Sequence, residues 1–218
     1  MNNGEIIAWQ RETKARELIK KMENRGFTAH YAVNSEMARK LVLDLLPVVG
    51  SIALLGSQTM NQIGVYEQLR QSGRSLVDHA TQTKPDSNPE EALNYKRGIF
   101  HAAAMLASAN AVDSEGRLYN IDGIGNRVAG MIFGPDSVIL AIGLNKLTAT
   151  PQEAWRRIRQ IASPLNNKRL GLPNPCIRSG RCHDCQTLSS ICNYFTIIDR
   201  SKPEKRIKIV LIGEDLGY

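Results

Sequence analysis

One stretch of this sequence combines the residue types that bind anions and move protons. The segment NIDGIGNR carries Asp122, Asn126 and Arg127 in a loop that contains Gly123 and Gly125. Glycines let the backbone adopt dihedrals closed to other residues, so the polar side chains at the start of the following helix can face an anion. The pattern predicts an anion site with an acid–base group. A simpler interpretation stays open, in which the Asp and Asn side chains only cap that helix.

Two more polar groups directly follow predicted strands. Asn145 and Lys146 come after the apolar strand 138–142, and the tetrapeptide GSQT at 56–59 comes after the strand 51–55. Backbone N–H groups and small hydroxyls at a strand-to-helix turn can bind phosphate or carboxylate. The tetrapeptide matches neither G-x-x-x-x-G-K-[ST] nor G-x-G-x-x-G, so neither nucleotide fingerprint applies. An ordinary helix N-cap is the alternative.

These groups are expected to share one crevice, because the carboxyl ends of parallel strands meet at one edge of a sheet. We expect the crevice to hold a small anionic metabolite such as a phosphorylated sugar, a CoA thioester or a hydroxy acid. Asp122 is the predicted catalytic base, since it alone in the set is acidic, and Glu115 and Asp215 are the alternatives. The predicted ligand-binding residues are Gly56, Ser57, Thr59, Gly123, Asn126, Arg127, Asn145 and Lys146.

All four cysteines lie close together, with the spacing Cys176-x5-Cys182-x2-Cys185-x6-Cys192. Loops this short let four thiolates converge on one metal, which predicts a zinc site or an iron–sulfur cluster. The spacing differs from the ferredoxin C-x2-C-x2-C run, which weakens an electron-transfer role but leaves a single cluster open. Four unrelated thiols are the remaining interpretation.

The elements that would position these residues alternate along the chain. Helices are predicted at 5–25, 35–46, 60–71, 90–108, 128–133 and 151–162, and strands at 27–33, 51–55, 75–79, 118–121, 138–142, 194–198 and 206–212. This alternation predicts an α/β fold with a doubly wound, mainly parallel sheet and helices on both faces. From residue 163 the composition shifts to Pro, Gly and Asn. We therefore predict a cysteine-rich loop module at 163–192, inserted between two parts of the α/β domain at 1–162 and 193–218.

Composition narrows the class of protein. The 218 residues are 42% hydrophobic, enough for one sizeable core. No run reaches the roughly 18 apolar residues of a membrane span, and the N-terminal residues lack a signal-peptide layout, so we expect a cytoplasmic protein with no membrane partner. In that reducing compartment clustered cysteines favour metal binding over disulfides.

The net charge of +7 is concentrated in one region. Residues 156–208 contain twelve Lys or Arg against three Asp or Glu, so the rest of the chain is near neutral. A basic patch can bind nucleic acid, but stacking aromatics are nearly absent from this region. We therefore do not expect a nucleic-acid partner.

With these motifs laid out, the chain resembles the lactate-utilisation (LUD) domain family, in a branch with a cysteine-bearing C-terminal extension. The resemblance rests on GSQT at 56–59, on the stretch 120–146, on NPCIRSGRCHDC at 174–185 and on VLIGEDLG at 210–217. It implies the fold shared by glucosamine-6-phosphate deaminases, ribose-5-phosphate isomerases and CoA transferases, with which a homodimer would be compatible.

The same resemblance implies an enzyme or enzyme component of small organic acid, lactate-like metabolism that acts alongside an iron–sulfur oxidoreductase partner. The cysteine module departs from the lactate proteins of the family. The alternative function is an accessory electron-transfer or metal-binding protein that docks to an oxidoreductase complex.

Overall fold

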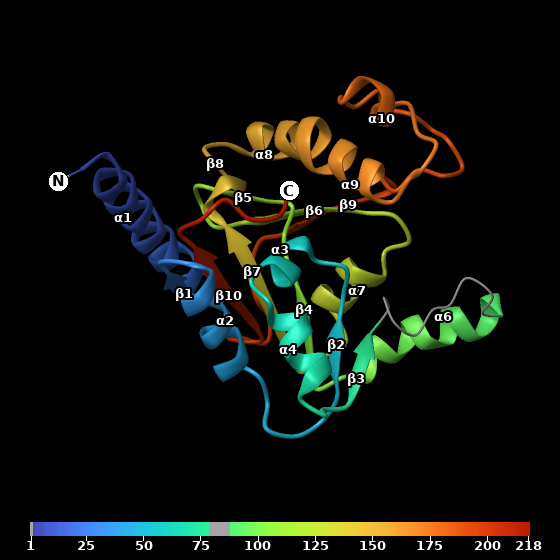
Figure 1. Ribbon diagram of the computed structural model, residues 1–218, viewed down its shortest axis with the longest axis horizontal. Helices are drawn as coiled ribbons and strands as arrows, with labels where there is room; N and C mark the ends of the chain where they lie inside the picture. The colour runs from blue at the N-terminus through green and yellow to red at the C-terminus, as the bar shows by residue number, and fades with distance from the viewer. Residues whose placement is uncertain (1, 79–87) are drawn as a thin grey trace.

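A computed structural model describes residues 2–78 and 88–218 and shows a parallel sheet with a smaller sheet at one end (Figure 1). All neighbouring strands of the larger sheet run parallel. In spatial order its strands are β1 (Thr28–Ala32), β10 (Ile207–Ile212), β7 (Ser137–Gly143), β4 (Ala104–Ala107), β2 (Ile52–Leu54) and β3 (Leu76–Asp78).

Helices pack on both faces of this sheet, which confirms the predicted doubly wound architecture. Side chains from α1 (Asn3–Glu23) and α7 (Asn126–Ile132) join the hydrophobic cluster on one face. Those from α2 (Ser35–Asp44), α3 (Gln58–Gln62) and α4 (Val65–Gln71) join the cluster on the other. Because successive strand side chains point to opposite faces, a strand covered on both sides is a continuous apolar run, as 138–142 is.

A second sheet of four strands lies at the carboxyl end of the first. Its order is β8 (Leu147–Thr148), β5 (Ala111–Asp113), β6 (Leu118–Asp122) and β9 (Tyr194–Ile198). β5 follows β4 after three residues, and a 3-10 turn (Leu144–Lys146) joins β7 to β8, so the chain carries this sheet across the carboxyl edge of the parallel one.

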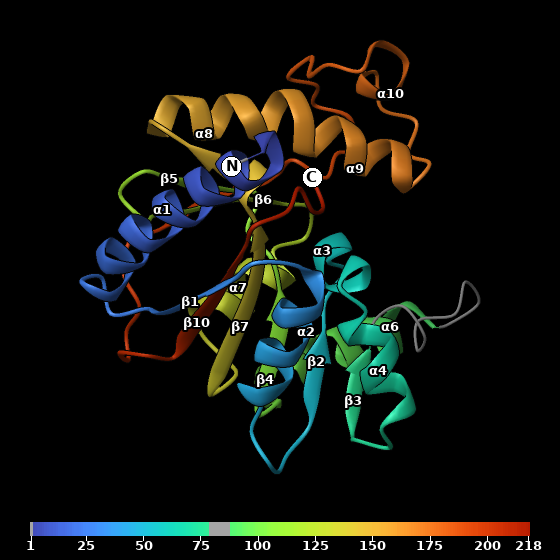
Figure 2. The ribbon, with the colours of Figure 1, turned by 60° about the vertical axis from the view of Figure 1, so that its left-hand side comes forward.

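Helical segments cover this second sheet on its outer side (Figure 2). α8 (Pro151–Arg157), a π-helical turn (Ile158–Ala162) and α9 (Ser163–Arg169) follow one another without a break. Ala154 and Ile158 pack against Tyr119 and Ile121 of β6. The second sheet and these helical segments therefore form a further layer that covers the carboxyl edge of the parallel sheet.

Two predictions of secondary structure from the sequence are wrong, one for residues 90–108 and one for the chain from residue 163. The helix expected at 90–108 ends early, as α6 (Pro89–Arg97) and a 3-10 turn (Gly98–His101), and is followed by strand β4. The alanines of β4 favour a helix in isolation, but all four of its residues are buried between β2 and β7, so the tertiary position overrides propensity.

The second wrong prediction is a loop from residue 163 onward. The chain stays helical to Arg169, and Pro164 is accommodated directly after the π-helical turn (Ile158–Ala162), where the backbone hydrogen-bond pattern of the helix changes. The short helix α10 (Cys176–Ser179) then carries the first cysteine. Residue 79 of the predicted strand 75–79 lies outside the described residues, and no helix in the described ranges is long and apolar enough to cross a membrane.

Candidate functional site

A cleft of about 490 Å³ lies at the carboxyl edge of the parallel sheet, beneath the second sheet and α9. Residues that follow β2, β4, β6 and β7 line it, as the crevice prediction requires. Among the ten residues predicted from sequence for the site, those that line this cleft are Gly56, Ser57, Asp122, Gly123, Asn126, Arg127 and Lys146.

Lys146 lies in the wall of the cleft with its side chain almost fully buried. Its Nζ donates to Thr59 Oγ1 at 3.0 Å and to Ser108 Oγ at 2.9 Å. Within the described ranges no carboxylate forms an ion pair with it. Burial, and then the nearby positive charges of Arg157 and Arg127, lower the pKa of Lys146 to about 7. The site therefore holds an amine whose charge has hydroxyl partners but no counter-ion.

Thr59 and Asn145 stand behind the cleft wall and hold the chain around Lys146. Asn145 Oδ1 accepts the N–H of Leu216 at 3.1 Å, and its Nδ2 donates to the carbonyl of Gly217 at 3.4 Å. A Cβ on Gly217 would lie 2.5 Å from Thr59 Oγ1 and 3.0 Å from Lys146 Nζ, so only glycine fits there. Asn145, predicted as a ligand-binding residue, thus positions the segment 213–218 against Lys146.

Arg127 ties the ends of two strands together. Its Nε donates to Asp122 Oδ2 at 3.2 Å and its Nη1 to the Ser108 carbonyl at 2.8 Å. Its Nη2 donates to Asn110 Oδ1 at 2.9 Å and to the Ile121 carbonyl at 2.7 Å. Four of the five guanidinium donors are therefore engaged within the protein, and the charge is paired with Asp122. Of these two residues, only Lys146 has a charge with no carboxylate partner among the described residues.

Ser57 is the N-cap of α3, as the alternative interpretation of GSQT predicted. Its Oγ accepts the N–H of Met60 at 3.2 Å and so caps α3. The hydroxyl hydrogen is not used in that bond, and Ser57 lines the cleft. The residue can therefore cap the helix and donate to a ligand.

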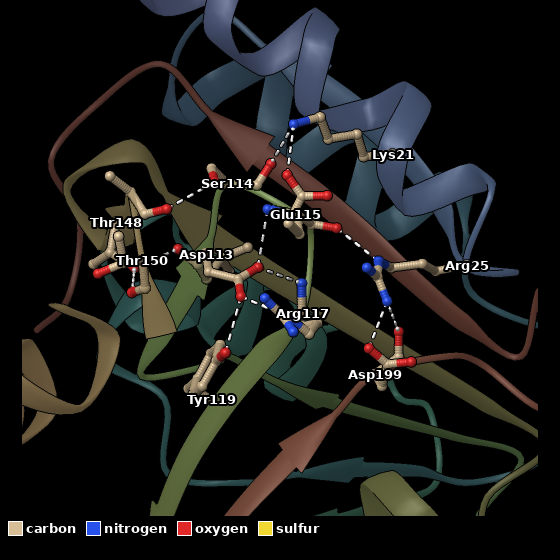
Figure 3. A network of polar contacts seen from close by, with 12 residues as sticks. Lys21, Arg25, Asp113, Ser114, Glu115, Arg117, Tyr119, Thr148, Thr150 and Asp199 are labelled. Carbon is tan, nitrogen blue, oxygen red and sulfur yellow. Dashed lines mark hydrogen bonds and ion pairs between the residues drawn. The ribbon is translucent and has the colours of Figure 1, made fainter. Parts of the chain in front are cut away.

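Glu115 lies away from the cleft, in the turn that precedes β6 (Figure 3). Its carboxylate pairs with Lys21 Nζ at 3.0 Å, and its carbonyl accepts from Arg25 Nε at 2.7 Å. β6 separates this turn from Asp122 by roughly 15 Å at the rise of an extended strand. Asp215, the other alternative carboxylate, pairs with Arg11 at 2.9 Å and does not line the cleft.

A buried carboxylate that sequence reasoning missed organises the same turn (Figure 3). Asp113 accepts the N–H groups of Glu115 and Arg117, Arg117 Nε and Tyr119 Oη, at 2.7–3.0 Å. Burial acts to raise the pKa of Asp113, but the hydrogen bonds from Arg117 and Tyr119 outweigh it and the pKa lies below its usual value. This network fixes the β5–β6 turn and has a structural role.

A second cavity of about 360 Å³ is lined by all four cysteines. All are free thiols; Cys176 is buried and the other three are partly exposed. Burial, reinforced by the neighbouring thiols, raises the pKa of both Cys176 and Cys192. Among residues 2–78 and 88–218, no three Cys, His, Asp or Glu side chains lie close enough together to hold a single metal ion. The thiols thus surround a shared space without meeting at one point.

Asn174 anchors the cysteine loop to α9. Its Nδ2 donates to Asn167 Oδ1 at 2.6 Å, and its Oδ1 accepts Thr187 Oγ1 at 2.6 Å and Ser189 Oγ at 2.7 Å. Both asparagines are almost completely buried. No sequence motif marks this network, since it joins residues whose partners are known only once the loop has folded back.

The two cavities share a wall. Ile121 and Ser163 line both of them. On either side of Cys192, Ile191 lies against Gly123, and Asn193 Nδ2 donates to the Gly123 carbonyl at 2.9 Å. The end of the cysteine loop is therefore also part of the cleft.

The molecule is an α/β protein whose cleft lies at the carboxyl edge of a parallel sheet, next to a four-thiol cavity. The LUD domain matches residues 15–212, so the chain belongs to the LUD domain family. The crystal structure of a DUF162 family protein from Deinococcus radiodurans is similar, with a TM-score of 0.52 and 12% identity over 93% of this chain and 97% of that one. At this identity the likeness shows the fold alone. No curated protein matches the chain.

Proposed function

We propose that this LUD-domain protein binds a small anionic metabolite in the cleft and acts as an enzyme or enzyme component of lactate-like organic acid metabolism. The observation that carries the proposal is the buried amine of Lys146, which has two hydroxyl partners and no carboxylate partner in the described part of the chain. A buried charge without a counter-ion is costly, and a bound carboxylate would remove that cost. The same cleft is lined by Asp122, the proposed general base, which is held by an ion pair with Arg127.

The same electrostatics predict how binding depends on pH. An anion beside Lys146 stabilises the protonated amine, so binding takes up a proton when the free site is neutral. With a pKa of about 7 in the free protein, affinity should be highest below neutral pH and fall as the pH rises. A site built on an always-charged arginine would not show this dependence.

The four cysteines are proposed to hold a metal centre, either zinc or an iron–sulfur cluster. Four thiolates around Zn²⁺ leave a net charge of −2, and the guanidinium of Arg159 lines the same cavity and would offset it. The wall shared with the cleft supports a second candidate function. In it the protein is an accessory electron-transfer component that docks to an iron–sulfur oxidoreductase partner.

Calorimetry with L-lactate, pyruvate and inorganic phosphate would test the anion site. We expect at least one of these anions to bind, about tenfold or more weakly to Lys146→Met, and more weakly at about pH 9 than at about pH 6. Lys40→Met is the matched control, since it removes the same charge from an exposed position on α2. Equal affinity of Lys146→Met and wild type, or no binding of any of the three anions, would refute the proposal.

A further inference from the structure

We propose that the Nζ atom of Lys146 is a nucleophile that forms an imine with the carbonyl carbon of a 2-oxo acid bound in the cleft. The inference rests on the proposed function and deepens it, because it names a class of substrate and a covalent step for the same site. It depends on the hydrogen-bond partners of this nitrogen, on its place in the cleft wall and on the charges near it.

The amine of Lys146 has one position without a partner. A lysine nitrogen carries three hydrogens when it is charged, and two hydrogens and a lone pair when it is neutral. Two of these positions are taken by the bonds to Thr59 Oγ1 and Ser108 Oγ. Within residues 2–78 and 88–218 the nitrogen makes no third hydrogen bond. The arrangement therefore satisfies the two N–H groups of a neutral amine and leaves its lone pair unused.

The two hydroxyls act as acceptors toward this nitrogen. Ser108 Oγ donates its own hydrogen to the carbonyl of Ala109 at 3.2 Å, and Thr59 Oγ1 donates to the carbonyl of Leu216 at 3.5 Å. Because a hydroxyl has only one hydrogen, both groups accept from Lys146 and do not donate to its lone pair. The lone pair is therefore free to form a new bond.

The nitrogen stands in the wall of a space large enough for a substrate. Lys146 and Ser108 both line the cleft, and their Nζ and Oγ atoms are 2.9 Å apart. The cleft volume of about 490 Å³ lies within the range typical of small-molecule sites. A carbonyl compound that binds against this wall thus meets a nucleophile together with a hydroxyl that can exchange protons with it.

The charges around Lys146 favour the neutral amine and attract an anion. Burial, and then the positive charges of Arg157 and Arg127, lower its pKa to about 7. At pH 7 about half of these amines are therefore neutral, whereas an ordinary lysine, with a pKa of about 10.4, is neutral in fewer than about one molecule in a thousand. The neutral amine is the form that attacks a carbonyl group. The two arginines also favour a substrate that has a carboxylate beside its carbonyl.

The atoms and charges of the step balance within the site. The lone pair of Nζ forms a bond to the carbonyl carbon, and the π electrons of the carbonyl move to its oxygen. The hydroxyl of Ser108 gives a hydrogen to that oxygen and takes one from Nζ, which yields a carbinolamine. Loss of water, with the second hydrogen of the nitrogen, then forms the C=N bond. A proton from solvent makes this an iminium, so the carboxylate of the substrate has a positive charge beside it.

Reductive trapping on the whole protein tests the imine directly. Sodium cyanoborohydride donates hydride to a C=N bond and leaves a secondary amine that survives digestion and mass spectrometry. With pyruvate or 2-oxoglutarate at neutral pH, we expect the reduced adduct on the peptide that contains Lys146, and none on the peptide that contains the exposed Lys40. L-lactate, which has a hydroxyl in place of the carbonyl of pyruvate, should give no adduct. Absence of the Lys146 adduct with both oxo acids, or equal labelling of Lys146 and Lys40, would overturn the inference.

Two variants separate the nucleophile from its charge. Arginine stays protonated and forms no imine, so Lys146→Arg should bind the anions in calorimetry but give no adduct, whereas Lys146→Met should lose both. An adduct at wild-type level in either variant would overturn the assignment, and the wild-type digest decides the matter if the variants fail to fold. Calorimetry and trapping are read separately. Anion binding without an adduct refutes only this inference, and an adduct that forms equally well with acetone, which has no carboxylate, refutes only the proposed function.

Discussion

Replacing Lys146 by methionine should remove a pH-dependent stability penalty. Burial, then the charges of Arg157 and Arg127, lower the pKa of Lys146 from 10.5 to about 7. Between those two pH values the unfolded chain keeps a proton on this amine that the folded protein has released. Stability rises with pH wherever the unfolded state binds more protons, so the wild type gains stability from neutral to alkaline pH.

The size of the effect follows from the shift. A difference of about 3.5 pKa units corresponds to about 5 kcal/mol over the whole range, and a single proton gives a slope of about 1.4 kcal/mol per pH unit. Lys146→Met cannot titrate at this position. The unfolding free energy of the wild type minus that of the variant should therefore increase with this slope between about pH 8 and pH 10, and level off below about pH 7.

Urea unfolding at a series of pH values measures this difference directly. The contributions of other titratable groups are the same in both proteins and cancel in the subtraction as long as their surroundings are unchanged. Lys40→Met is the control, because its side chain is exposed and the wild type and this variant should give parallel curves. A constant difference between wild type and Lys146→Met would show that the buried amine stays protonated, and would refute both the reasoning and its extension to anion binding.

Two further substitutions test the surroundings of the cleft. Gly143→Ala would place a Cβ 2.5 Å from Asn145 Oδ1 and 2.7 Å from the Leu216 nitrogen. We therefore expect it to lower the free energy of unfolding in urea by about 1–3 kcal/mol. Gly56→Ala is the control, because a Cβ at residue 56 would meet nothing within 4 Å, and its stability should stay within about 0.5 kcal/mol of wild type. Equal unfolding midpoints for the two would contradict this packing. Asp113→Asn should lower the free energy of unfolding by about 2–3 kcal/mol at neutral pH, because it removes the charge that Arg117 and Tyr119 bind. The wild type should lose this advantage in stability as the pH falls below about 4 and through the lowered pKa of Asp113. A variant as stable as wild type at pH 7 would contradict the structural role of this network.

The class of fold could be predicted from the sequence because local patterns determine it. Alternating apolar strands and amphipathic helices predict a doubly wound sheet, and strands β7 and β10 lie within one residue of their expected limits. β4 could not be predicted, because its alanines and leucine favour a helix until the flanking strands β2 and β7 bury both of its faces. In the second sheet β6 and β9 were expected as strands, but β5 and β8 were not, because strands of three and two residues are defined by their partners and not by a period of their own.

For the candidate site, too, the sequence predicted the location of the residues but not their individual roles. Polar residues placed directly after strands were expected to meet at one edge, and Ser57, Asp122 and Lys146 do line one cleft. Their individual roles depend on neighbours distant in the chain. The guanidinium of Arg127 donates hydrogen bonds to Ser108, to Asn110 and to the end of β6, so it is engaged within the protein and not free to bind a ligand.

The sequence by itself thus determined most of the helices and strands, the edge at which the polar residues gather and the presence of a compact four-thiol module. Each of these depends on residues adjacent in the chain. The tertiary structure alone decided that the charge of Lys146 has no carboxylate partner among the described residues and that the thiol cavity adjoins the cleft. The last of these depends on Asn193 binding the Gly123 carbonyl, a contact between residues seventy positions apart that no local pattern encodes.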